Sequence, residues 1–265
     1  MSQLVLSEKS GRVLTLTINR PEALNALNQQ SLRELRKAIE AAARDASVGC
    51  LIVTGAGRAF CAGADLREVS ARYLAGDTEL GEDLRRSYAP LVRAIRACPK
   101  PVIAAINGTA AGAGLSLALA CDLRIAAAGA QLIVVFVKVG LVPDAGSLFF
   151  LTRTFGFSKA LELALTGEGM AVEEAQRLGA IAAVVPPEQL MATAVERARQ
   201  LAEGPTTAYG LIKRGLERAL SLDLEQSLEL ESHLQTLAAR TPDHQEALAA
   251  FLEKRKPVFN KEMAG

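Results

Sequence analysis

The stretch that decides the fold is residues 101–122, PVIAAINGTAAGAGLSLALACD. Its apolar start, Pro101 to Ile106, predicts a buried strand, and Asn107-Gly108 predicts a turn after it. The apolar run from Leu115 to Ala120 predicts the first turns of a buried helix, which follows the small residues Gly112-Ala113-Gly114. A helix that begins in this way presents free backbone N–H groups to a ligand, and the small residues let the ligand come close.

The composition predicts a globular protein and argues against two classes of partner. A chain of 265 residues, half of them hydrophobic, can bury a large core. The net charge of +1 gives no support to binding of nucleic acid or of a membrane surface. The N-terminal sequence MSQLVLSEKSGRV has no signal-peptide core, and no apolar run is long enough to span a bilayer, so we expect a soluble cytoplasmic protein.

The histidines and cysteines do not predict a metal site or a catalytic triad. Only two histidines are present, His233 and His244, and both fall in a C-terminal region that is predicted to be helical. A Ser-His-Asp triad and a histidine-rich metal site are therefore disfavoured, and we expect no metal. The cysteines are widely spaced without a C-x-x-C pair, so we expect reduced and buried thiols at Cys50, Cys61, Cys98 and Cys121.

Short strands and helices alternate along the chain before residue 204, which predicts an α/β core. Weak periodicity at residues 67–83 predicts a surface helix and a flexible flap. Strands are predicted at residues 12–18, 50–54, 101–106, 123–127, 131–137 and 181–185. Helices are predicted at residues 29–44, 84–95, 115–120, 147–155, 159–165, 172–178 and 187–203.

The remainder of the chain is predicted to be helical throughout. Gly204-Pro205 marks the boundary, and helices are expected at about 206–220, 223–240 and 242–255. Thr241 as N-cap and Pro242 at the first helical position give the last of these a strong start signal. We therefore divide the chain into a core of residues 1–203 and a helical region of residues 204–265.

Two loops of similar composition follow two of the predicted strands. Gly63-Ala64-Asp65 comes after the strand at 50–54, and Gly112-Ala113-Gly114 comes after the strand at 101–106. Each can present a backbone N–H without a bulky side chain in the way, and two converging donors form an oxyanion hole. The alternative is that both are turns for close packing of a helix on a strand. A phosphate- or dinucleotide-binding loop is disfavoured because neither glycine fingerprint is present.

An oxyanion hole works with a proton-transfer group beside it, and Asp144 is the candidate for that group. Asp144 lies in the turn VPDAG at residues 142–146, at the start of a predicted helix and among the largely apolar residues 132–150. Apolar surroundings raise the pKa of a carboxyl group toward values useful near neutral pH. The alternative is structural, because an aspartate after proline is a good turn and N-cap residue.

Six segments in the same order resemble the crotonase (enoyl-CoA hydratase/isomerase) superfamily and together run through nearly the whole chain. They are residues 19–27 (NRPEALNAL), 57–66 (GRAFCAGADL), 99–108 (PKPVIAAING), 120–124 (ACDLR), 140–146 (GLVPDAG) and 251–257 (FLEKRKP). The resemblance implies a spiral of ββα repeats, a C-terminal helical trimerisation region, and homotrimers that are often paired into hexamers. It implies an acyl-CoA thioester as substrate, with coenzyme A as part of that substrate and no separate cofactor.

The resemblance also implies the residues of a site. The thioester oxygen would lie between the N–H groups of Ala64 and Ala113, and the family usually has a glycine at the second of these positions. Asp65 is expected to order its loop as a hydrogen-bond acceptor. The implied substrate-binding residues are Leu24, Ala62, Ala64, Asp65, Leu66, Gly112, Ser116 and Phe136, with Phe251 and Lys254 contributed to the coenzyme A of a neighbouring subunit.

Two positions depart from the hydratases of this family, which use two glutamates to add water. The first glutamate falls on Ser116 and the second on Phe136. A serine without a base partner is a poor proton acceptor, and phenylalanine has no exchangeable proton. The Pro143-Asp144 turn instead resembles members that keep one acid–base residue there, namely double-bond isomerases and the ring-opening epoxyphenylacetyl-CoA isomerase. A related dehalogenase has a nucleophilic aspartate at the same position.

We therefore expect an acyl-CoA isomerase in which Asp144 removes and returns a proton while the oxyanion hole holds the enolate. A hydratase with a rearranged acid–base set, for instance a flap glutamate, is the first alternative. The second is an inactive member that binds acyl-CoA, a partner or RNA. Its basis is a locally basic helix with few aromatic residues, at Arg85, Arg86, Arg93, Arg96 and Lys100.

Overall fold

A computed structural model describes residues 3–260 and contains two β-sheets of unequal size. The larger sheet has the strand order β1-β2-β3-β5-β7-β10, and the smaller has the order β4-β6-β8-β9. The strands are β1 (Val5–Ser10), β2 (Val13–Ile18), β3 (Cys50–Gly55), β4 (Ala59–Cys61), β5 (Val102–Ile106), β6 (Thr109–Ala111), β7 (Leu123–Ala127), β8 (Gln131–Ile133), β9 (Gly169–Ala171) and β10 (Ala183–Val185).

The order of the strands makes the core a spiral. β3, β5 and β7 are parallel neighbours in the larger sheet, and each is followed along the chain by a strand of the smaller sheet, β4, β6 or β8. Those three strands are parallel neighbours in turn. After each pair the chain returns through helices, so every ββα turn advances by one strand spacing, about 4.8 Å. The ββα spiral that the family resemblance implies is confirmed.

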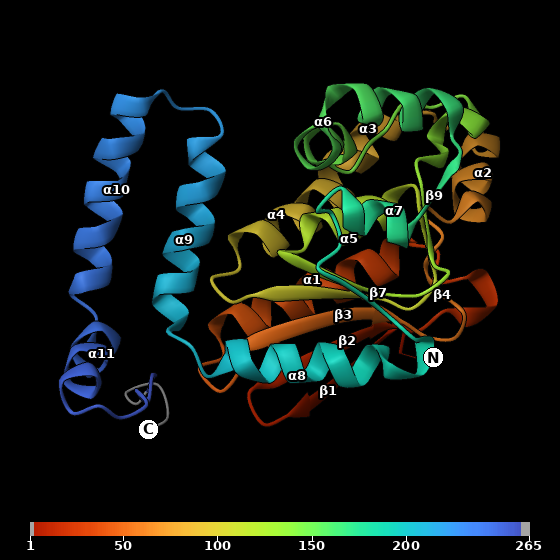
Figure 1. The fold of residues 1–265 in the computed structure, drawn as a ribbon. Helices are drawn as coiled ribbons and strands as arrows, with labels where there is room; N and C mark the ends of the chain where they lie inside the picture. Colours follow the sequence, from red (N-terminus) through yellow and green to blue (C-terminus); the bar gives the residue numbers. More distant parts are fainter. Residues whose placement is uncertain (1–2, 261–265) are drawn as a thin grey trace.

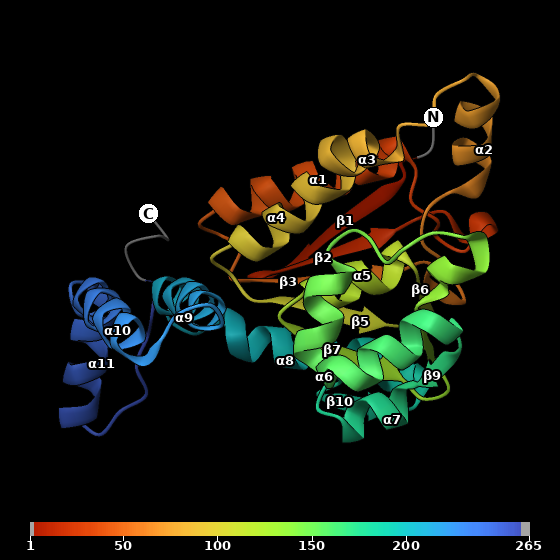
Figure 2. The same cartoon turned by 90° about the horizontal axis from the view of Figure 1, so that it is seen from above.

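The helices fall into those that cover the sheets and those that leave them (Figures 1 and 2). The helical segments of the core are η1 (Pro21–Ala23), α1 (Gln29–Arg44), α2 (Leu66–Leu74), α3 (Leu80–Asp83), the π-helical turn η2 (Leu84–Tyr88), α4 (Ala89–Ala97), α5 (Ala113–Ala120), η3 (Val135–Val139), α6 (Ser147–Thr166), α7 (Val172–Arg177), η4 (Pro187–Gln189) and α8 (Leu190–Ala202). Three more follow: α9 (Thr206–Ala219), α10 (Leu224–Ala239) and α11 (Pro242–Leu252).

The larger sheet is buried on both faces because alternate side chains enter two different cores. Along β3, Leu51 and Val53 pack into a core with α1, α4 and α5, whereas Cys50 and Ile52 pack under α8. Figure 1 shows α8 below the sheet and the other three helices above it. Burial on both faces explains why these strands read as continuous apolar runs. All four cysteines are buried free thiols, as expected.

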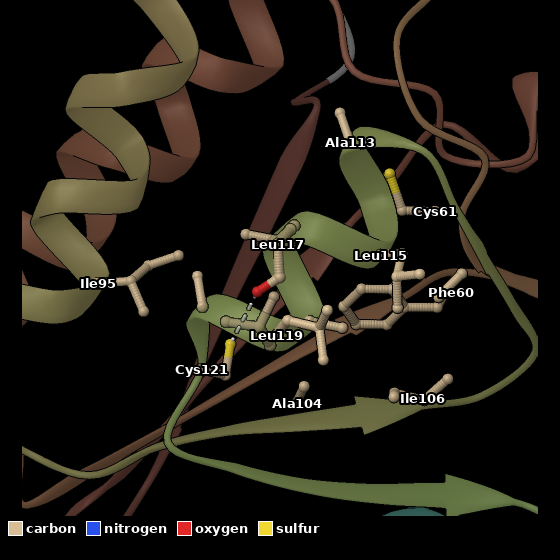
Figure 3. Close-up of a cluster of buried hydrophobic side chains, with 14 of the residues drawn as sticks. Phe60, Cys61, Ile95, Ala104, Ile106, Ala113, Leu115, Leu117, Leu119 and Cys121 are labelled. Carbon is tan, nitrogen blue, oxygen red and sulfur yellow. Dashed lines mark hydrogen bonds between the residues drawn. The ribbon is translucent and has the colours of Figure 1, made fainter. Parts of the chain in front are cut away.

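Helix α5 is the centre of the upper core. All eight of its residues are buried, which is typical of a helix that is apolar on every side. Figure 3 shows Leu115 and Leu119 among Phe60, Ile106 and other apolar side chains, with Ala113 at the N-terminal end of the helix. The helix begins at Ala113, two residues earlier than the apolar run predicts, because the small residues Ala113 and Gly114 also adopt helical geometry.

The C-terminal helices α9, α10 and α11 extend away from the sheets, and we call residues 206–252 the helical arm (Figures 1 and 2). Lys213 anchors its root, because its Nζ lies 2.7 Å from Asp122 Oδ2 and donates to the carbonyl oxygen of Cys98. Thr241 caps α11 with Pro242 at its first position, as the sequence predicts. Many apolar side chains of the arm remain exposed: Ile212, Leu216, Leu220, Leu224, Leu228, Leu248, Phe251 and Leu252.

Three sequence predictions need correction. Strands β1, β4, β6 and β9 were not expected, and the last three contain only three residues each. The strand predicted at residues 131–137 ends at Ile133, where pairing with both β6 and β9 stops, and the chain continues as η3. The helix predicted from residue 187 begins as the 3₁₀ turn η4 before α8. The predicted break in α6 is confirmed at Gly156, whose φ of 73° interrupts the helix.

Candidate active site

The two glycine loops that the sequence singles out lie against each other. A Cβ atom built on Gly63 would lie 3.4 Å from the backbone nitrogen of Ala113 and 3.6 Å from Gly112 Cα. Both glycines have positive φ, 101° at Gly63 and 52° at Gly112, which a residue with a side chain rarely adopts. The loops after β4 and β6 therefore meet at the start of α5, where only glycine leaves room for the neighbouring backbone.

Two backbone N–H groups at this junction are free. Ala113 is the first residue of α5, so its N–H has no partner within the helix. Within residues 3–260, neither this N–H nor that of Ala64 donates to a protein group. Gly114 brings α5 close to β4, since a Cβ on Gly114 would overlap the carbonyl oxygen of Cys61 and lie 2.7 Å from its Cβ. Two free backbone donors are what an oxyanion hole requires, so the N–H groups of Ala64 and Ala113 remain the predicted pair.

The first loop is held by the segment before α1. The N–H of Ala62 donates to the carbonyl oxygen of Leu24 at 3.0 Å, and the N–H of Leu27 donates to that of Gly63 at 2.7 Å. Asp65 completes the pairing by donating its own N–H to Leu27 O at 2.9 Å. Leu24, Ala62, Ala64 and Asp65 are thus brought together, and Leu66 begins α2 with an exposed side chain.

The carboxylate of Asp65 orders this loop. Its Oδ2 lies 2.7 Å from Arg20 Nη2, and its Oδ1 accepts the N–H of Arg67 as the N-cap of α2. Burial favours the neutral acid, but the hydrogen bonds from Arg20 and Arg67 outweigh it and keep the pKa of Asp65 below its ordinary value. Asp65 is therefore ionised near neutral pH and occupied on both oxygens, which suits a loop-ordering acceptor.

Asp144 lies in a strained turn before α6. The two residues after it, Ala145 and Gly146, have positive φ of 50° and 88°. The Asp144 side chain is half-buried, and its Oδ1 is the only buried carboxylate oxygen within residues 3–260 that has no hydrogen-bond partner. Burial raises the pKa of Asp144 to about 6, with the nearby carboxylate of Asp83 as the second cause. The side chain thus does not act as a helix cap, the structural alternative.

Asp83 and Tyr88 are neighbours of Asp144 that sequence reasoning did not select. Asp83 lies at the end of α3, where its Oδ2 is 2.8 Å from Arg72 Nη1 and its other oxygen accepts from Gln29. Tyr88 is buried, and burial together with the charges of Asp83 and Asp144 raises the pKa of its hydroxyl group. The helical spacing of Leu84 and Tyr88 indicated a core helix only, and no motif marked Asp83.

Ser116 does not line an open pocket. Its side chain is fully buried, and its Oγ lies 2.5 Å from Ser147 Oγ, 3.1 Å from the carbonyl oxygen of Asp144 and 3.2 Å from that of Gly112. The hydroxyl group of Ser116 is therefore occupied by the protein, and contact of Ser116 with substrate stays a prediction. One oxygen atom of Ser116 joins the start of α5 to the turn that carries Asp144.

Phe136 forms an apolar wall beside the second loop. Its side chain is buried in η3, and a Cβ built on Gly112 would lie 3.9 Å from Phe136 Cζ and 3.3 Å from Val135 Cγ1. A hydrocarbon ring therefore lies next to Gly112, the residue before Ala113. At the two positions where the resemblance places the glutamates of a hydratase, Ser116 and Phe136, the chain has no ionisable group.

Phe251 and Lys254 are not brought to this site by their own chain. Phe251 lies at the end of the helical arm and Lys254 just beyond it, and Figures 1 and 2 show the arm apart from α5 and the sheets. The Phe251 side chain is 80% exposed. Within residues 3–260, no group of three or more histidine, cysteine, aspartate or glutamate side chains is arranged to hold a metal ion, and no helix is long and apolar enough to cross a membrane.

A sequence model of the enoyl-CoA hydratase/isomerase family matches residues 8–262. The chain belongs to this family. It is 43% identical to the 1,2-epoxyphenylacetyl-CoA isomerase of Escherichia coli K12 over 98% of this chain and 99% of that protein. It is 38% identical to the 2,3-dehydroadipyl-CoA hydratase of the same organism, over 98% and 99% of the two chains.

Solved structures of the family share the fold. The crystal structure of an enoyl-CoA hydratase from Bacillus anthracis superposes with a TM-score of 0.89 at 35% identity, over 97% of this chain and 99% of that one. The crotonase fold that the sequence resemblance implied is therefore confirmed, including its helical C-terminal region. Members named isomerase and members named hydratase are both similar to this chain, so the family alone does not select the reaction.

Proposed function

We propose that this chain is an acyl-CoA isomerase that uses Asp144 as its single acid–base group. The observation that carries the proposal is the half-buried carboxyl of Asp144, which has an unpartnered oxygen and a pKa of about 6. A carboxyl group with this pKa is ionised enough near neutral pH to accept a proton and acidic enough to return it. The occupied hydroxyl of Ser116 and the hydrocarbon of Phe136 supply no second acid to activate water.

The proposed reaction moves a double bond. The thioester oxygen of a 3-enoyl-CoA accepts hydrogen bonds from the N–H groups of Ala64 and Ala113, which makes the C2 hydrogens more acidic. The Asp144 carboxylate removes a proton from C2, and the electron pair enters a dienolate whose negative charge lies on the thioester oxygen. Asp144 then returns the proton at C4, and the double bond comes to lie between C2 and C3. No atom is gained or lost, so one carboxyl group suffices.

An epoxide of an aromatic acyl-CoA is the other substrate class for this site. The support is the 43% identity to a protein named 1,2-epoxyphenylacetyl-CoA isomerase, together with the apolar wall that Phe136 forms beside the oxyanion loop. Opening the epoxide ring is also an isomerisation, and the enolate would again be stabilised by the two N–H groups. Both reactions therefore place the same demands on Ala64, Ala113 and Asp144.

The test is turnover of 3-enoyl-CoA and of epoxyphenylacetyl-CoA by the wild type and by an Asp144→Asn variant. We expect a loss of 10²–10⁴-fold in kcat for the variant, the range for removal of a general base. An Asp77→Asn variant is the matched control and should keep its turnover, because that exposed carboxylate pairs with Arg72 and does not act on Asp144. Unchanged turnover after Asp144→Asn would remove this carboxyl from the mechanism and end the proposal.

The hydratase alternative is supported by the 38% identity to 2,3-dehydroadipyl-CoA hydratase. Two of the flap glutamates that it would recruit, Glu68 and Glu82, are engaged elsewhere. Glu68 Oε2 accepts the N–H of Gln29 at 3.1 Å, and Glu82 pairs with Arg85 and Arg86. Hydration of crotonyl-CoA at a rate comparable to the isomerase rate, and lost in a Glu68→Gln variant, would favour the hydratase.

The basic helix gives little support to the RNA-binding alternative. Four of its five cations are engaged within the chain. Arg85 and Arg86 pair with Glu82, Arg96 pairs with Asp122 and Glu217, and the buried Lys100 donates to two carbonyl oxygens. A filter-binding assay with a salt titration tests this alternative, and we expect no retention of RNA even at low salt.

We also propose that the helical arm packs against neighbouring subunits in a trimer or a dimer of trimers. Its exposed leucines include Leu216 and Leu224, and a single copy of the chain leaves both largely in water. Exposed apolar surface of this extent marks an interaction surface. Such packing would also bring Phe251 and Lys254 to the coenzyme A of a neighbour. Light scattering on the full chain measures the number of subunits.

A further inference from the structure

The hydroxyl groups of Ser116 and Ser147 connect the two halves of the candidate site. Ser116 lies on α5, one turn after the free N–H of Ala113, and Ser147 is the first residue of α6, three residues after Asp144. Both side chains are at least 99% buried. Their oxygens lie 2.5 Å apart, which is a short hydrogen bond between two neutral hydroxyl groups.

The direction of these hydrogen bonds follows from counting donors and acceptors. Each hydroxyl group has one hydrogen to donate. The Ser147 hydroxyl has Ser116 Oγ as its only partner within residues 3–260, so it donates there. Ser116 then donates its own hydrogen to a carbonyl oxygen, with Asp144 O at 3.1 Å and Gly112 O at 3.2 Å as the acceptors within reach. No hydrogen is left over, and no hydroxyl group is unsatisfied.

The turn that receives these bonds needs support. Ala145 has a φ of 50°, a backbone conformation that is unfavourable for any residue with a Cβ, and Gly146 follows with another positive φ. Such strain persists at functional sites only where the surrounding structure holds it in place. The carbonyl oxygen of Asp144 accepts the N–H of Ser147 at 2.8 Å and is the nearer of the two carbonyl acceptors of the Ser116 hydroxyl.

We infer that Ser116 and Ser147 form a positioning pair that fixes the Asp144 carboxyl relative to the oxyanion N–H groups. The inference rests on the proposed function, because it concerns how Asp144 is held for proton transfer. Ser116 touches the carbonyl of Gly112, the residue before Ala113, and the carbonyl of Asp144 through one oxygen atom. A displacement of about 1 Å at a catalytic group can reduce a rate by about 100-fold, so this link has a direct consequence for catalysis.

The pKa of Asp144 is a quantity that distinguishes positioning from a purely structural role, because loss of stability alone would leave this pKa unchanged. The titratable group that acts on its carboxyl is Asp83 on α3, and the carboxyl in turn acts on the hydroxyl of Tyr88 on η2. If the turn relaxes, the carboxyl gains solvent and its pKa falls toward the ordinary value. The acid limb of the pH profile of kcat/KM reports this pKa and then moves to lower pH.

The experiment measures kcat, KM and the pH profile for Ser116→Ala, Ser147→Ala and the double variant, with 3-enoyl-CoA as the probe. We expect each single variant to lose about 10- to 100-fold in kcat with KM changed by less than about threefold. The double variant should be no worse than the singles, because the two hydroxyl groups act as one unit. The acid limb should move to lower pH in all three.

Ser31→Ala is the matched control. Ser31 is also a fully buried serine, but it caps α1 with Asn28, so its loss lowers stability without touching Asp144. We expect a lower melting temperature with unchanged kcat and pH profile. Ser116→Cys and Ser147→Cys, which keep a side chain of similar size with a weaker donor, replace any alanine variant that does not fold and should show a smaller loss of kcat.

Two outcomes separate the positioning inference from the proposed function. If Asp144→Asn abolishes isomerisation while the serine variants keep the wild-type kcat and acid limb, the positioning pair is wrong and the proposed function stands. If Asp144→Asn keeps full activity, the proposed function is wrong whatever the serines do. An equal loss of kcat in the Ser31→Ala control would also contradict the positioning pair, because general destabilisation would then explain the loss.

Discussion

The two sides of the candidate site are built in opposite ways. The oxyanion side consists of small residues at the junction of β4, β6 and α5, held by close backbone packing around Gly63, Gly112 and Gly114. The proton-transfer side consists of a strained turn, a half-buried carboxyl and polar neighbours, among them Asp83. The oxyanion side presents backbone dipoles in fixed positions. The proton-transfer side has a strained backbone and an ionisable group whose pKa depends on its neighbours.

This difference predicts which substitutions act on rate and which act on stability or pH dependence. A substitution on the oxyanion side lowers the rate by removing a hydrogen-bond donor, or lowers stability by disturbing the packing of β4, β6 and α5. A change on the proton-transfer side alters the ionisation of Asp144, and with it both activity and the free energy of unfolding. Four variants test the contrast, beginning with the largest effect.

Ala113→Pro should have the largest effect on the oxyanion side. Proline is compatible with the first position of α5 but has no N–H, so the variant removes one donor and keeps the helix. Loss of one oxyanion donor typically costs 10²–10³-fold in kcat, and we expect a loss of about that size. Ala113→Gly, which keeps the N–H, is the control and should retain most of the activity. Equal kcat in the two variants would contradict the assignment of this donor.

Gly114→Ala should act through packing. The added Cβ would overlap the carbonyl oxygen of Cys61 and lie 2.7 Å from Cys61 Cβ, so β4 and α5 must separate. We expect a loss of about 1–3 kcal/mol in the free energy of unfolding, the range for overpacking a core. Gly81→Ala on α3, where an added Cβ meets nothing within 4 Å, is the control and should be neutral or slightly stabilising in denaturant unfolding.

Asp144→Asn should stabilise the protein in a pH-dependent way. The pKa of this carboxyl is raised from 3.8 to about 6 on folding, so the folded state holds the proton more strongly. The wild type therefore loses stability as the pH rises from about 4 to about 6, and the loss is complete above that range. The variant has no carboxyl group to ionise and therefore does not undergo this loss of stability. We expect a gain on the order of 1 kcal/mol at pH 8 and none at pH 4 in thermal unfolding.

Asp83→Asn should have the smallest effect, a shift of the pH profile. Removing the charge of Asp83 removes the second cause of the raised pKa of Asp144, so the acid limb of kcat/KM should move to lower pH. The shift should be partial because burial is the larger cause. Asp77→Asn is the matched control, since Asp77 also pairs with Arg72 but does not act on Asp144. Equal shifts in the two variants would remove Asp83 from the environment of the carboxyl.

Much of the oxyanion side could be predicted from the sequence because its signals are local. The apolar run at 101–106, the turn at Asn107-Gly108 and the buried helix after it correspond to β5, the turn into β6, and α5. The bounds of α1 were also predicted, and the structure shows Asn28 as its cap with Ser31 at the third position. Spacing and turn chemistry act over a few residues, so the chain itself contains the information.

The proton-transfer side could be predicted only in part because its contacts are distant along the chain. Asp144 was selected from its turn, but Ser116 and Ser147 meet across 31 residues and Asp83 reaches Asp144 from the flap. The short strands β4 and β6 were missed because three residues carry too little periodicity. The end of β8 was missed because it is set by the pairing partners of the strand and not by its own apolar residues.

The central claim is that Asp144 exchanges a proton with carbon atoms of a thioester whose oxygen is held by Ala64 and Ala113. Incubation of a 3-enoyl-CoA with enzyme in D₂O, followed by NMR of the recovered substrate and product, tests it most directly. We predict deuterium at C2 or C4 with the wild type and at least a 10²-fold slower incorporation with Asp144→Asn. Deuterium entering at the same rate with both enzymes would contradict the account.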